Sequence, residues 1–235
     1  MTAAPLTDAD LDALRAFDTP TVCNALEALD QRWRTSGFTS APLVCAHPDL
    51  PPIVGYAHTA TIRAVAPPPE SGAALRDKRL AYYRYIEAGP RPSIAVIEDL
   101  DPTPGFGAYW GEVQTAVHKG LGCAGLVTNG SMRDLDDVAP GFQLLAGLVG
   151  PSHAWVHLVE VDVTVTVAGL TVRPGDLVHA DRHGAAVIPA ELAREVPKTA
   201  KLLARREAVI LDAARAPGFT AEKLAACFAE QDDIH

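Results

Sequence analysis

SIAVIEDLDPTPGFGAYWGEVQTAVHKGLGCAGLVT, residues 93–128, contains two short apolar runs separated by a glycine-rich loop and a helical pattern. The two runs, 93–97 and 122–127, have the length and composition of buried strands. The segment 112–121 fits a helix, and the glycines before it punctuate a loop. A strand, a loop, a helix and a strand in this order connect a parallel pair, so the sequence predicts a mixed α/β protein.

The segment before this stretch is expected to begin with helices. Thr7 and Asp10 have the spacing of a capping box at a helix start, and a second helix is expected over 21–29. β-Branched residues over 53–65 predict a strand, and a helical pattern follows over 73–88. The first long strand therefore comes after two helices and an irregular segment.

The segment after this stretch changes from short strands to helices. A turn or short helix is expected over 131–138. Alternating or apolar patterns predict strands over 159–167, 170–172, 177–180 and 184–188. A helical region from 189 to about 214, broken or kinked at Pro197, is followed by a helix over 221–230.

The sequence contains no repeat or linker that would divide the chain. We therefore predict one unit over 1–235, with a core of about 10–210 and C-terminal helices within 190–230.

The charge balance and the lack of targeting patterns exclude several functions. The chain has 29 acidic and 20 basic residues and a formal net charge of -9, so nucleic-acid binding is not expected. The N-terminus lacks a signal-peptide pattern, and no segment reaches the roughly 18 apolar residues of a membrane span. The four scattered cysteines lack the spacing of a zinc site. We expect a soluble cytoplasmic protein with reduced thiols and no membrane contact.

One candidate site lies where the glycine-rich loop becomes a helix. Gly111 and Glu112 stand at this point, so the free amides of Val113 and Gln114 would face a ligand above the helix N-terminus. A carboxylate or phosphate is favoured there by the unpaired N–H groups and the helix dipole. The ordinary alternative is a helix start that binds only water or its own cap.

A second polar pair follows the next predicted strand. Arg133 and Asp134 come after the strand over 122–127, at the carboxyl end where parallel sheets place ligand-binding loops. The two loops should therefore converge, one with an acid at a helix start and the other with a guanidinium beside a carboxylate. For an arbitrary Arg-Asp dipeptide, a surface ion pair is the ordinary alternative.

The spacing of these two pairs resembles a family signature. Glu112, twenty intervening residues and then Arg133-Asp134 are similar to the acid-x20-Arg-Asp signature of the RraA-like family. That family includes divalent-metal-dependent 4-hydroxy-4-methyl-2-oxoglutarate/4-carboxy-4-hydroxy-2-oxoadipate aldolases. Segments 19–26, 54–59 and 172–184 resemble other parts of the family's domain. The resemblance covers roughly 10–210 and implies a β/β/α swivelling-type domain with N- and C-terminal helices.

The resemblance also implies roles for the polar residues. Asp134 would anchor Mg²⁺ or Mn²⁺ largely through water, and Glu112 would act as a base through a metal-activated water. Arg133 would donate to the keto oxygen of the substrate. The loop at Gly111 would bind the substrate carboxylate. Glu207 resembles an acid that reaches a neighbouring subunit's site, although a solvated helix face is its ordinary alternative.

The activity implied is the cleavage of a 4-hydroxy-2-oxo acid to pyruvate, with oxaloacetate decarboxylation as a side activity. A homotrimer or dimer of trimers, with the active site between subunits, is implied as well. The alternative function from another class is that of a non-catalytic regulator that binds a ribonuclease, because the family is also similar to such a regulator. A menaquinone-precursor methyltransferase is disfavoured, because no glycine-rich nucleotide loop follows the first strand.

Four features depart from the aldolases, and they concern the choice of substrate more than the use of a metal. Glu112 stands where Asp is commoner, Asn24 and Asn129 replace acids, and the segment 152–157 looks different.

Four further residues in the second half of the chain are candidates for binding or structural roles. His153 and His157 would share one side of a helix or strand; a metal site is one interpretation, and contact of one of them with the distal end of the substrate is favoured over it. Ordinary structural roles are the remaining alternative for both. Asp181 and His183 are expected to shape a turn.

Overall fold

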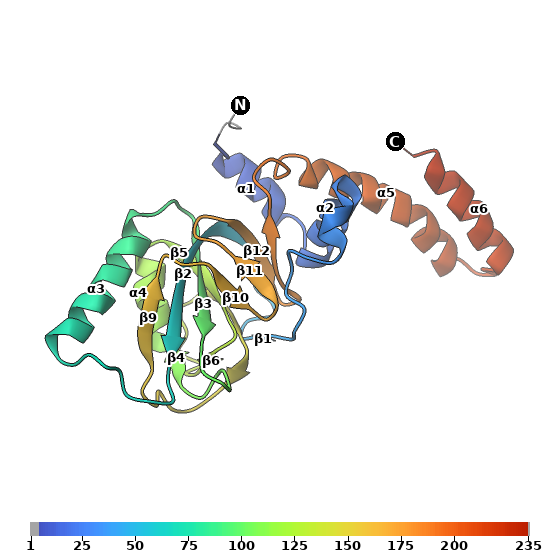
Figure 1. The fold of residues 1–235 in the computed structure, drawn as a ribbon. Coiled ribbons are helices and arrows are strands. Elements are labelled where there is room, and N and C mark those ends of the chain that lie inside the picture. The colour runs from blue at the N-terminus through green and yellow to red at the C-terminus, as the bar shows by residue number, and fades with distance from the viewer. Residues whose placement is uncertain (1–4, 235) are drawn as a thin grey trace.

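An eight-stranded mixed sheet forms the body of the protein (Figure 1). The computed structural model describes residues 5–234. The strands of this sheet are β1 (Val44–Cys45), β2 (Ile53–Arg63), β3 (Ser93–Asp99), β5 (Cys123–Thr128), β7 (Gln143–Ala146), β9 (His157–Val161), β12 (Leu177–Asp181) and β13 (Gly184–Ile188). Their order is β1-β7-β5-β3-β2-β12-β13, and β9 pairs with the C-terminal half of β2. Strands β7, β5, β3 and β2 run parallel, and the others pair antiparallel.

The parallel pair predicted from residues 93–128 lies at the centre of this sheet. β3 and β5 are adjacent, with Val96 opposite Val127, and the helix α4 (Glu112–Gly120) lies between them in sequence. Both strands are buried almost throughout, which explains why their sequences are continuous apolar runs. The mixed α/β prediction is confirmed.

The two faces of the sheet are covered differently. The helix α3 (Ala73–Ala88) and α4 cover one face, where Tyr82 and Ile86 pack against Leu126. The hairpin of β10 (Val165–Val167) and β11 (Leu170–Val172) covers the other face. The single strand predicted over 159–167 is wrong, because the segment forms two strands, β9 and β10. Asp162, which has a φ of 62°, lies between them.

A second, small parallel sheet lies beside the body and was not predicted. Its strands, in spatial order, are β4 (Ala108–Trp110), β6 (Ser131–Met132) and β8 (Leu148–Val149). β4 lies within the segment expected to be a loop. The turn or helix expected over 131–138 begins instead with the strand β6. Strands of two or three residues are too short to show a period, which is why the sequence pattern missed them.

The N-terminal helices were predicted correctly. The helix α1 (Asp8–Arg15) starts with the expected capping box, in which Thr7 and Asp10 bond each other's backbone amides. The helix α2 (Thr19–Leu29) is capped by Asp18. Leu11 and Val22 pack with residues of β12 and β13, so these helices bury the end of the sheet. A short 3-10 helix, η1 (Gln31–Arg34), follows.

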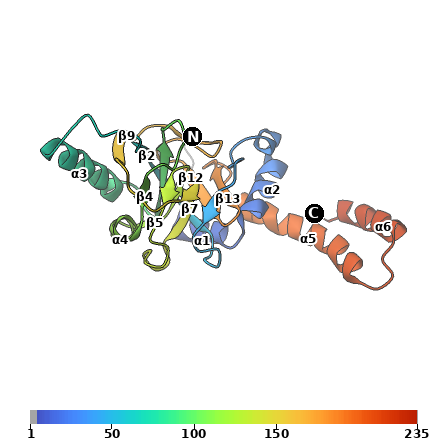
Figure 2. The same ribbon diagram turned by 90° about the horizontal axis from the view of Figure 1, so that it is seen from below.

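The C-terminal helices extend away from the body, at the end opposite α3 (Figures 1 and 2). They are α5 (Val196–Arg215) and α6 (Ala221–Asp232), and α6 folds back along α5. The helical region expected from 189, broken or kinked at Pro197, begins only at Val196 and has no kink at Pro197. Pro197 lies in the first turn of α5, where its missing N–H costs nothing, and 190–195 form turns. Within residues 5–234, none of the helices combines the length and apolarity that a membrane crossing requires.

Candidate functional site

The small sheet brings the two predicted polar pairs together. β4 and β6 are parallel, with Trp110 opposite Met132, so the residues that follow each strand lie side by side. The amide of Arg133 donates to the carbonyl oxygen of Trp110 at 2.8 Å and continues this pairing. The expected convergence therefore occurs. Its immediate cause is the small sheet rather than the ends of β3 and β5.

The N-terminus of α4 is capped from the other loop. Gly111 is the N-cap residue and has no side chain to offer. Instead Oδ2 of Asp134 accepts from the amide of Glu112 at 3.3 Å. No hydrogen-bond acceptor among residues 5–234 is paired with the amides of Val113 and Gln114. Two backbone donors at the positive end of the helix therefore remain available to an anion.

The backbone at this junction permits the close approach. A Cβ atom added to Gly111 would lie 2.4 Å from Oδ2 of Asp134 and 3.1 Å from Cγ of Arg133. Asp134 itself has a φ of 54°, in the left-handed region that Asp tolerates better than most residues. Both features keep the carboxylate against the start of α4.

Arg133 is fixed at one end of its guanidinium and free at the other. Its Nε lies 3.3 Å from Oδ2 of Asp134. Within the described part of the chain, the two terminal nitrogens have no paired acceptor, and about 30% of the side chain is exposed. The planar donor group is thus oriented by Asp134 and available to a ligand oxygen.

These groups surround a pocket of about 380 Å³. The lining residues are Arg79, Tyr109, Gly111, Val113, Gln114, Arg133, Asp134, His153 and Val156. Six of the predicted site residues are therefore together, and the volume falls within the usual range for small-molecule sites. Arg79 and Tyr109 are additions that sequence reasoning missed, because no local pattern links α3 or β4 to the motif.

Two predicted acids lie outside this lining. The side chain of Glu112 is exposed at the start of α4, beside the pocket but not in its wall. Glu207 is exposed on α5, and α5 lies at the other end of the molecule from α3 and α4 (Figure 1). The role of Glu207 in a neighbouring subunit's site stays a prediction.

The donor set fits a loosely held hydrated cation rather than an enclosed metal centre. No group of three or more His, Cys, Asp or Glu side chains within residues 5–234 is arranged to hold a metal. Asp134 supplies one carboxylate, and the exposed Glu112 is adjacent in space. Mg²⁺ commonly uses one or two protein carboxylates and keeps its waters, so these residues suit Mg²⁺ or Mn²⁺ and not structural zinc.

Buried hydrogen bonds tie α4 to α3. Nδ1 of His118 donates to the carbonyl oxygen of Gln114 at 2.6 Å, since a carbonyl can only accept. Nε2 of His118 therefore accepts from the Tyr82 hydroxyl at 2.8 Å. Burial lowers the pKa of His118 to about 4, so the ring is neutral near pH 7. The helix α4, which carries part of the site, is thus fixed against α3.

The segment with the two predicted histidines is not helical. His153 lies in a loop and lines the pocket that contains Arg133 and Asp134. His157 begins β9, donates through Nδ1 to the carbonyl oxygen of Trp155 at 2.7 Å, and lines a smaller adjacent hollow. The two histidines therefore line different hollows. A metal ion shared by the two histidines does not fit this arrangement, and contact of His153 with the substrate stays a prediction.

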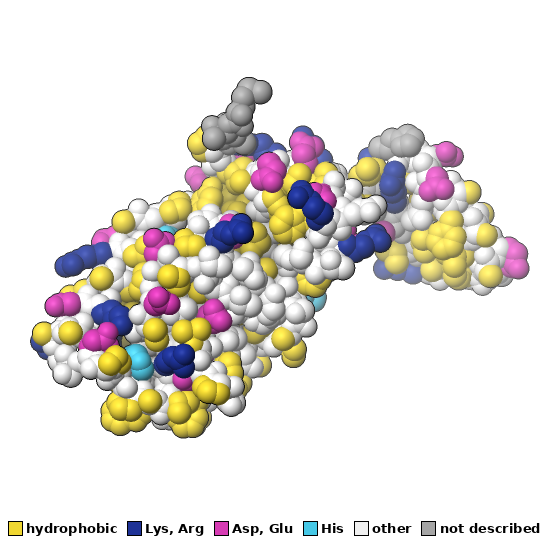
Figure 3. Space-filling model, in the orientation of Figure 1, with side chains coloured by type: hydrophobic (Ala, Val, Ile, Leu, Met, Phe, Trp, Pro, Cys, Tyr) yellow, Lys and Arg dark blue, Asp and Glu magenta, His cyan; other side chains and the backbone are white. Residues whose placement is uncertain are grey.

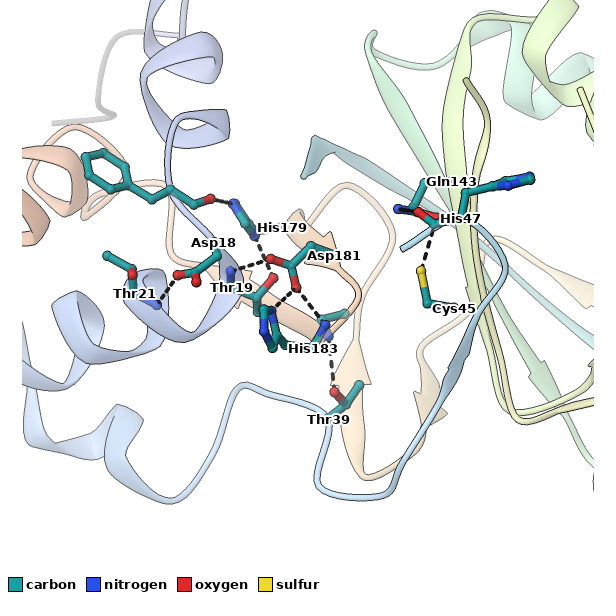
Figure 4. A network of polar contacts seen from close by, with 12 residues as sticks. Asp18, Thr19, Thr21, Thr39, Cys45, His47, Gln143, His179, Asp181 and His183 are labelled. Carbon is teal, nitrogen blue, oxygen red and sulfur yellow. Dashed lines mark hydrogen bonds and ion pairs between the residues drawn. The ribbon is translucent and has the colours of Figure 1, made fainter. Parts of the chain in front are cut away.

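A second polar cluster has a structural role (Figure 4). Oδ2 of Asp181 accepts from the amide of Thr19 at 2.9 Å, and Oδ1 accepts from the amide of His183 at 2.8 Å. His179 bonds the Thr19 hydroxyl at 3.0 Å. These contacts join the start of α2 to the β12–β13 turn, which confirms the prediction that Asp181 and His183 shape a turn.

The fold and the pocket define a mixed α/β protein with a polar site at the ends of a short parallel sheet. The family model of RraA-like proteins, described as Aldolase/RraA, matches residues 19–187. The chain therefore belongs to the RraA-like family, and the predicted family and fold are confirmed.

Known proteins similar to this chain fall into more than one functional class. An uncharacterized protein from Pseudomonas syringae pv. tomato has a TM-score of 0.71 and 24% identity, over 96% of this chain and 97% of that one. Streptomyces coelicolor RraAS2, described as an unusual member of the RNase ES inhibitor RraA family, has a TM-score of 0.66 and 23% identity, over 88% and 97%. These two similarities concern the fold.

A relative identified by sequence has an enzymatic name. A Pseudomonas fluorescens protein with the provisional name 4-hydroxy-4-methyl-2-oxoglutarate aldolase is 40% identical over 78 residues, which are 30% of this chain and 45% of that protein. The chain spans about half the length, or less, of the curated relatives it matches. The family thus contains proteins named as aldolases and proteins named as ribonuclease inhibitors.

Proposed function

We propose that this protein is a divalent-metal-dependent lyase that cleaves a 4-hydroxy-2-oxo acid to pyruvate and a second carbonyl compound. The observation that carries the proposal is the arrangement around one pocket of the Arg133 guanidinium, the Asp134 carboxylate and the two unpaired amides of α4. A protein that acts only by binding a partner has no need of an anion cradle beside a metal-type carboxylate.

Substrate binding follows from the donors. The carboxylate next to the keto group accepts from the amides of Val113 and Gln114, where the helix dipole favours negative charge. The keto oxygen then faces the free nitrogens of Arg133. This oxygen becomes negative as the C3–C4 bond breaks, so the guanidinium stabilises the transition state more than the ground state.

The proton steps use the other end of the site. Glu112, through a water, removes the proton of the 4-hydroxyl group. The O–H electrons form the new carbonyl, the C3–C4 bond breaks, and its electrons pass to C3 and the keto oxygen as the pyruvate enolate. Water returns a proton to C3. A Mg²⁺ or Mn²⁺ ion, which Asp134 and Glu112 would hold mainly through water, would supply Lewis-acid stabilisation of the enolate. Decarboxylation of oxaloacetate needs the same enolate and is an expected side activity.

The first test measures enolate formation without knowledge of the full substrate. Pyruvate in D₂O should exchange its methyl protons when the protein and Mg²⁺ or Mn²⁺ are present, as followed by NMR. Arg133→Ala should reduce exchange about 100-fold or more, because it deletes a donor to developing charge. Arg84→Ala, on the exposed side of α3 and outside the pocket lining, is the matched control and should keep full exchange.

The alternative is a non-catalytic regulator that binds a ribonuclease, the class named for the Streptomyces relative. Lack of exchange by the unaltered protein with either metal would reject the lyase proposal. Co-purification with a ribonuclease would then favour the regulator.

A further inference from the structure

A third element, α3, contributes an unpaired cation to the same pocket. Arg79 lines the pocket that contains Arg133 and Asp134 and also the smaller hollow beside it. Its side chain is exposed, and no acid within residues 5–234 forms an ion pair with it. Arg133, by contrast, is paired with Asp134, and Lys78, next to Arg79 in sequence, is paired with Glu70 at 2.8 Å. Arg79 is therefore a guanidinium without a partner at the wall of a hollow.

The pocket has a different charge character from the whole chain. The chain has a net charge of -9, yet the charged side chains in the pocket lining are Arg79, Arg133 and Asp134, and His153 is beside them. The carboxylate of Asp134 is already engaged by Arg133 and by the start of α4. The charge of Arg79, on α3, is therefore the one in the pocket lining that no carboxylate offsets.

Two neutral donors, on Gln114 and Tyr109, line the same pocket. The hydroxyl of Tyr83, also on α3, donates to Oε1 of Gln114 at 3.0 Å. The oxygen end of this amide is therefore occupied, and its NH₂ group is left as a donor in the pocket lining. Tyr109 is 7% exposed and lines both hollows, and its buried hydroxyl has no hydrogen-bond partner within the described residues. A buried donor without a partner is costly unless a ligand or water satisfies it.

We propose that Arg79 is a specificity-determining residue that binds a second negative charge on the substrate, assisted by the NH₂ group of Gln114. The inference rests on the proposed function, which assigns the first carboxylate to the amides of α4. The second anionic group lies on the part of the substrate that leaves as the carbonyl product. Tyr83 is a positioning residue, since it orients Gln114 without touching the substrate.

The test compares two ligands that differ at one position. 2-Oxoglutarate and 2-oxopentanoate have the same number of carbons, and the terminal carboxylate of the first is a methyl group in the second. Binding is measured by isothermal titration calorimetry at constant Mg²⁺. The unaltered protein should bind 2-oxoglutarate about tenfold more tightly or better, as expected for a hydrogen bond to a charged group.

Variants test whether Arg79 causes this difference in affinity. Arg79→Ala should bring the affinity ratio close to one, and Arg79→Lys, which keeps the charge but not the planar fork, should leave an intermediate ratio. Arg84→Ala, five residues along the same helix and outside the lining, should keep the original ratio. The inference is overturned if the unaltered protein binds both acids equally, or if Arg79→Ala keeps the ratio of Arg84→Ala.

The measurement also separates this inference from the proposed function. Calorimetry does not require turnover, and pyruvate exchange does not require a second carboxylate. Equal binding of the two acids together with pyruvate exchange would reject the role of Arg79 and still support the lyase proposal. Selective binding without exchange would leave an anion subsite in a protein that is not a lyase.

Discussion

Gly111 permits the two halves of the candidate site to touch. Its extended backbone would accept any residue, so φ does not explain the glycine. The explanation is space, since Oδ2 of Asp134 and Cγ of Arg133 occupy the positions around a Cβ atom. Asp134 caps α4 and orients Arg133 through the same oxygen. A side chain at position 111 would therefore disturb both contacts together.

We predict that Gly111→Ala lowers metal-dependent pyruvate exchange by about 10- to 100-fold, since displacement of positioning groups by about 1 Å has effects of this size. The exposed Asp134 can rotate away, so the free energy of unfolding should change by less than about 1 kcal/mol. Gly120→Ala is the matched control, because a Cβ there meets nothing within 4 Å and the residue ends the same helix. Full exchange by Gly111→Ala would contradict the steric account.

Asn129 illustrates which parts of a site a sequence pattern can and cannot predict. The family resemblance marks it as a departure from an acid and thus as a doubt about the substrate. In the structure its Oδ1 accepts from the amide of Asp99 at 2.8 Å, and its Nδ2 donates to the carbonyl oxygen of Asp99 at 3.1 Å. A carboxylate lacks the N–H donor, so an acid at this position could not make the second of these bonds. Such long-range bonding has no local signature.

At the scale of elements, length decides what the sequence predicts. α4, β3 and β5 were predicted within one or two residues, because each contains a full apolar period or run. β4 and β6 have three and two residues and show no period, yet they bring Glu112 and Arg133 together. The members of the site could therefore be identified from motif spacing, whereas the geometry and the contribution of α3 required the fold.

The connection between α3 and α4 has a consequence for pH. His118 is fully buried, and burial lowers its pKa from 6.5 to about 4. The unfolded chain therefore binds a proton between these pH values that the folded chain does not bind. The contribution of the neutral ring to the free energy of unfolding is therefore fully present above about pH 6.5. It is lost as the pH falls toward 4.

We predict that His118→Asn flattens the acid side of the stability profile. The free energy of unfolding of the unaltered protein should fall more steeply between pH 6.5 and 4, by about 1.4 kcal/mol per pH unit. Over this pH range, the unaltered protein should lose on the order of 3 kcal/mol more of its free energy of unfolding than His118→Asn loses. Urea unfolding at several pH values measures both slopes. His58 and His179 also have lowered pKa values but are present in both proteins, so they cancel. Parallel profiles would show that His118 is not the group responsible.

At the scale of the molecule, the C-terminal hairpin is the least enclosed part. The first turns of α5 bury Val196 and Ala200 in the core formed with α1 and α2. Farther along, α5 packs on α6, and Figure 3 shows a hydrophobic patch on this outer hairpin. The side chain of Phe228 is 52% exposed. The hairpin also lies beyond residue 187, where the family match ends.

This position bears on the prediction that Glu207 serves a neighbouring subunit. Glu207 is on α5, which lies at the opposite end of the molecule from α3 and α4 (Figure 2), and residues of α3 and α4 line the pocket. It can therefore reach a pocket only if another copy is present. A trimer would have about three times the 24.8 kDa mass of the chain, which light scattering measures directly.

Subunit mixing tests the shared site. Arg133→Ala and Glu207→Gln should each be nearly inactive in pyruvate exchange when purified alone. If each site takes Arg133 from one chain and Glu207 from the next, an equal mixture reassembled from dissociated subunits regains intact sites. Random assembly in a ring gives about a quarter of the unaltered activity, since each of the two intact residues is present with a probability of about one half. Activity of Glu207→Gln equal to that of the unaltered protein, or a mixture as inactive as its components, would contradict a site shared between neighbouring chains.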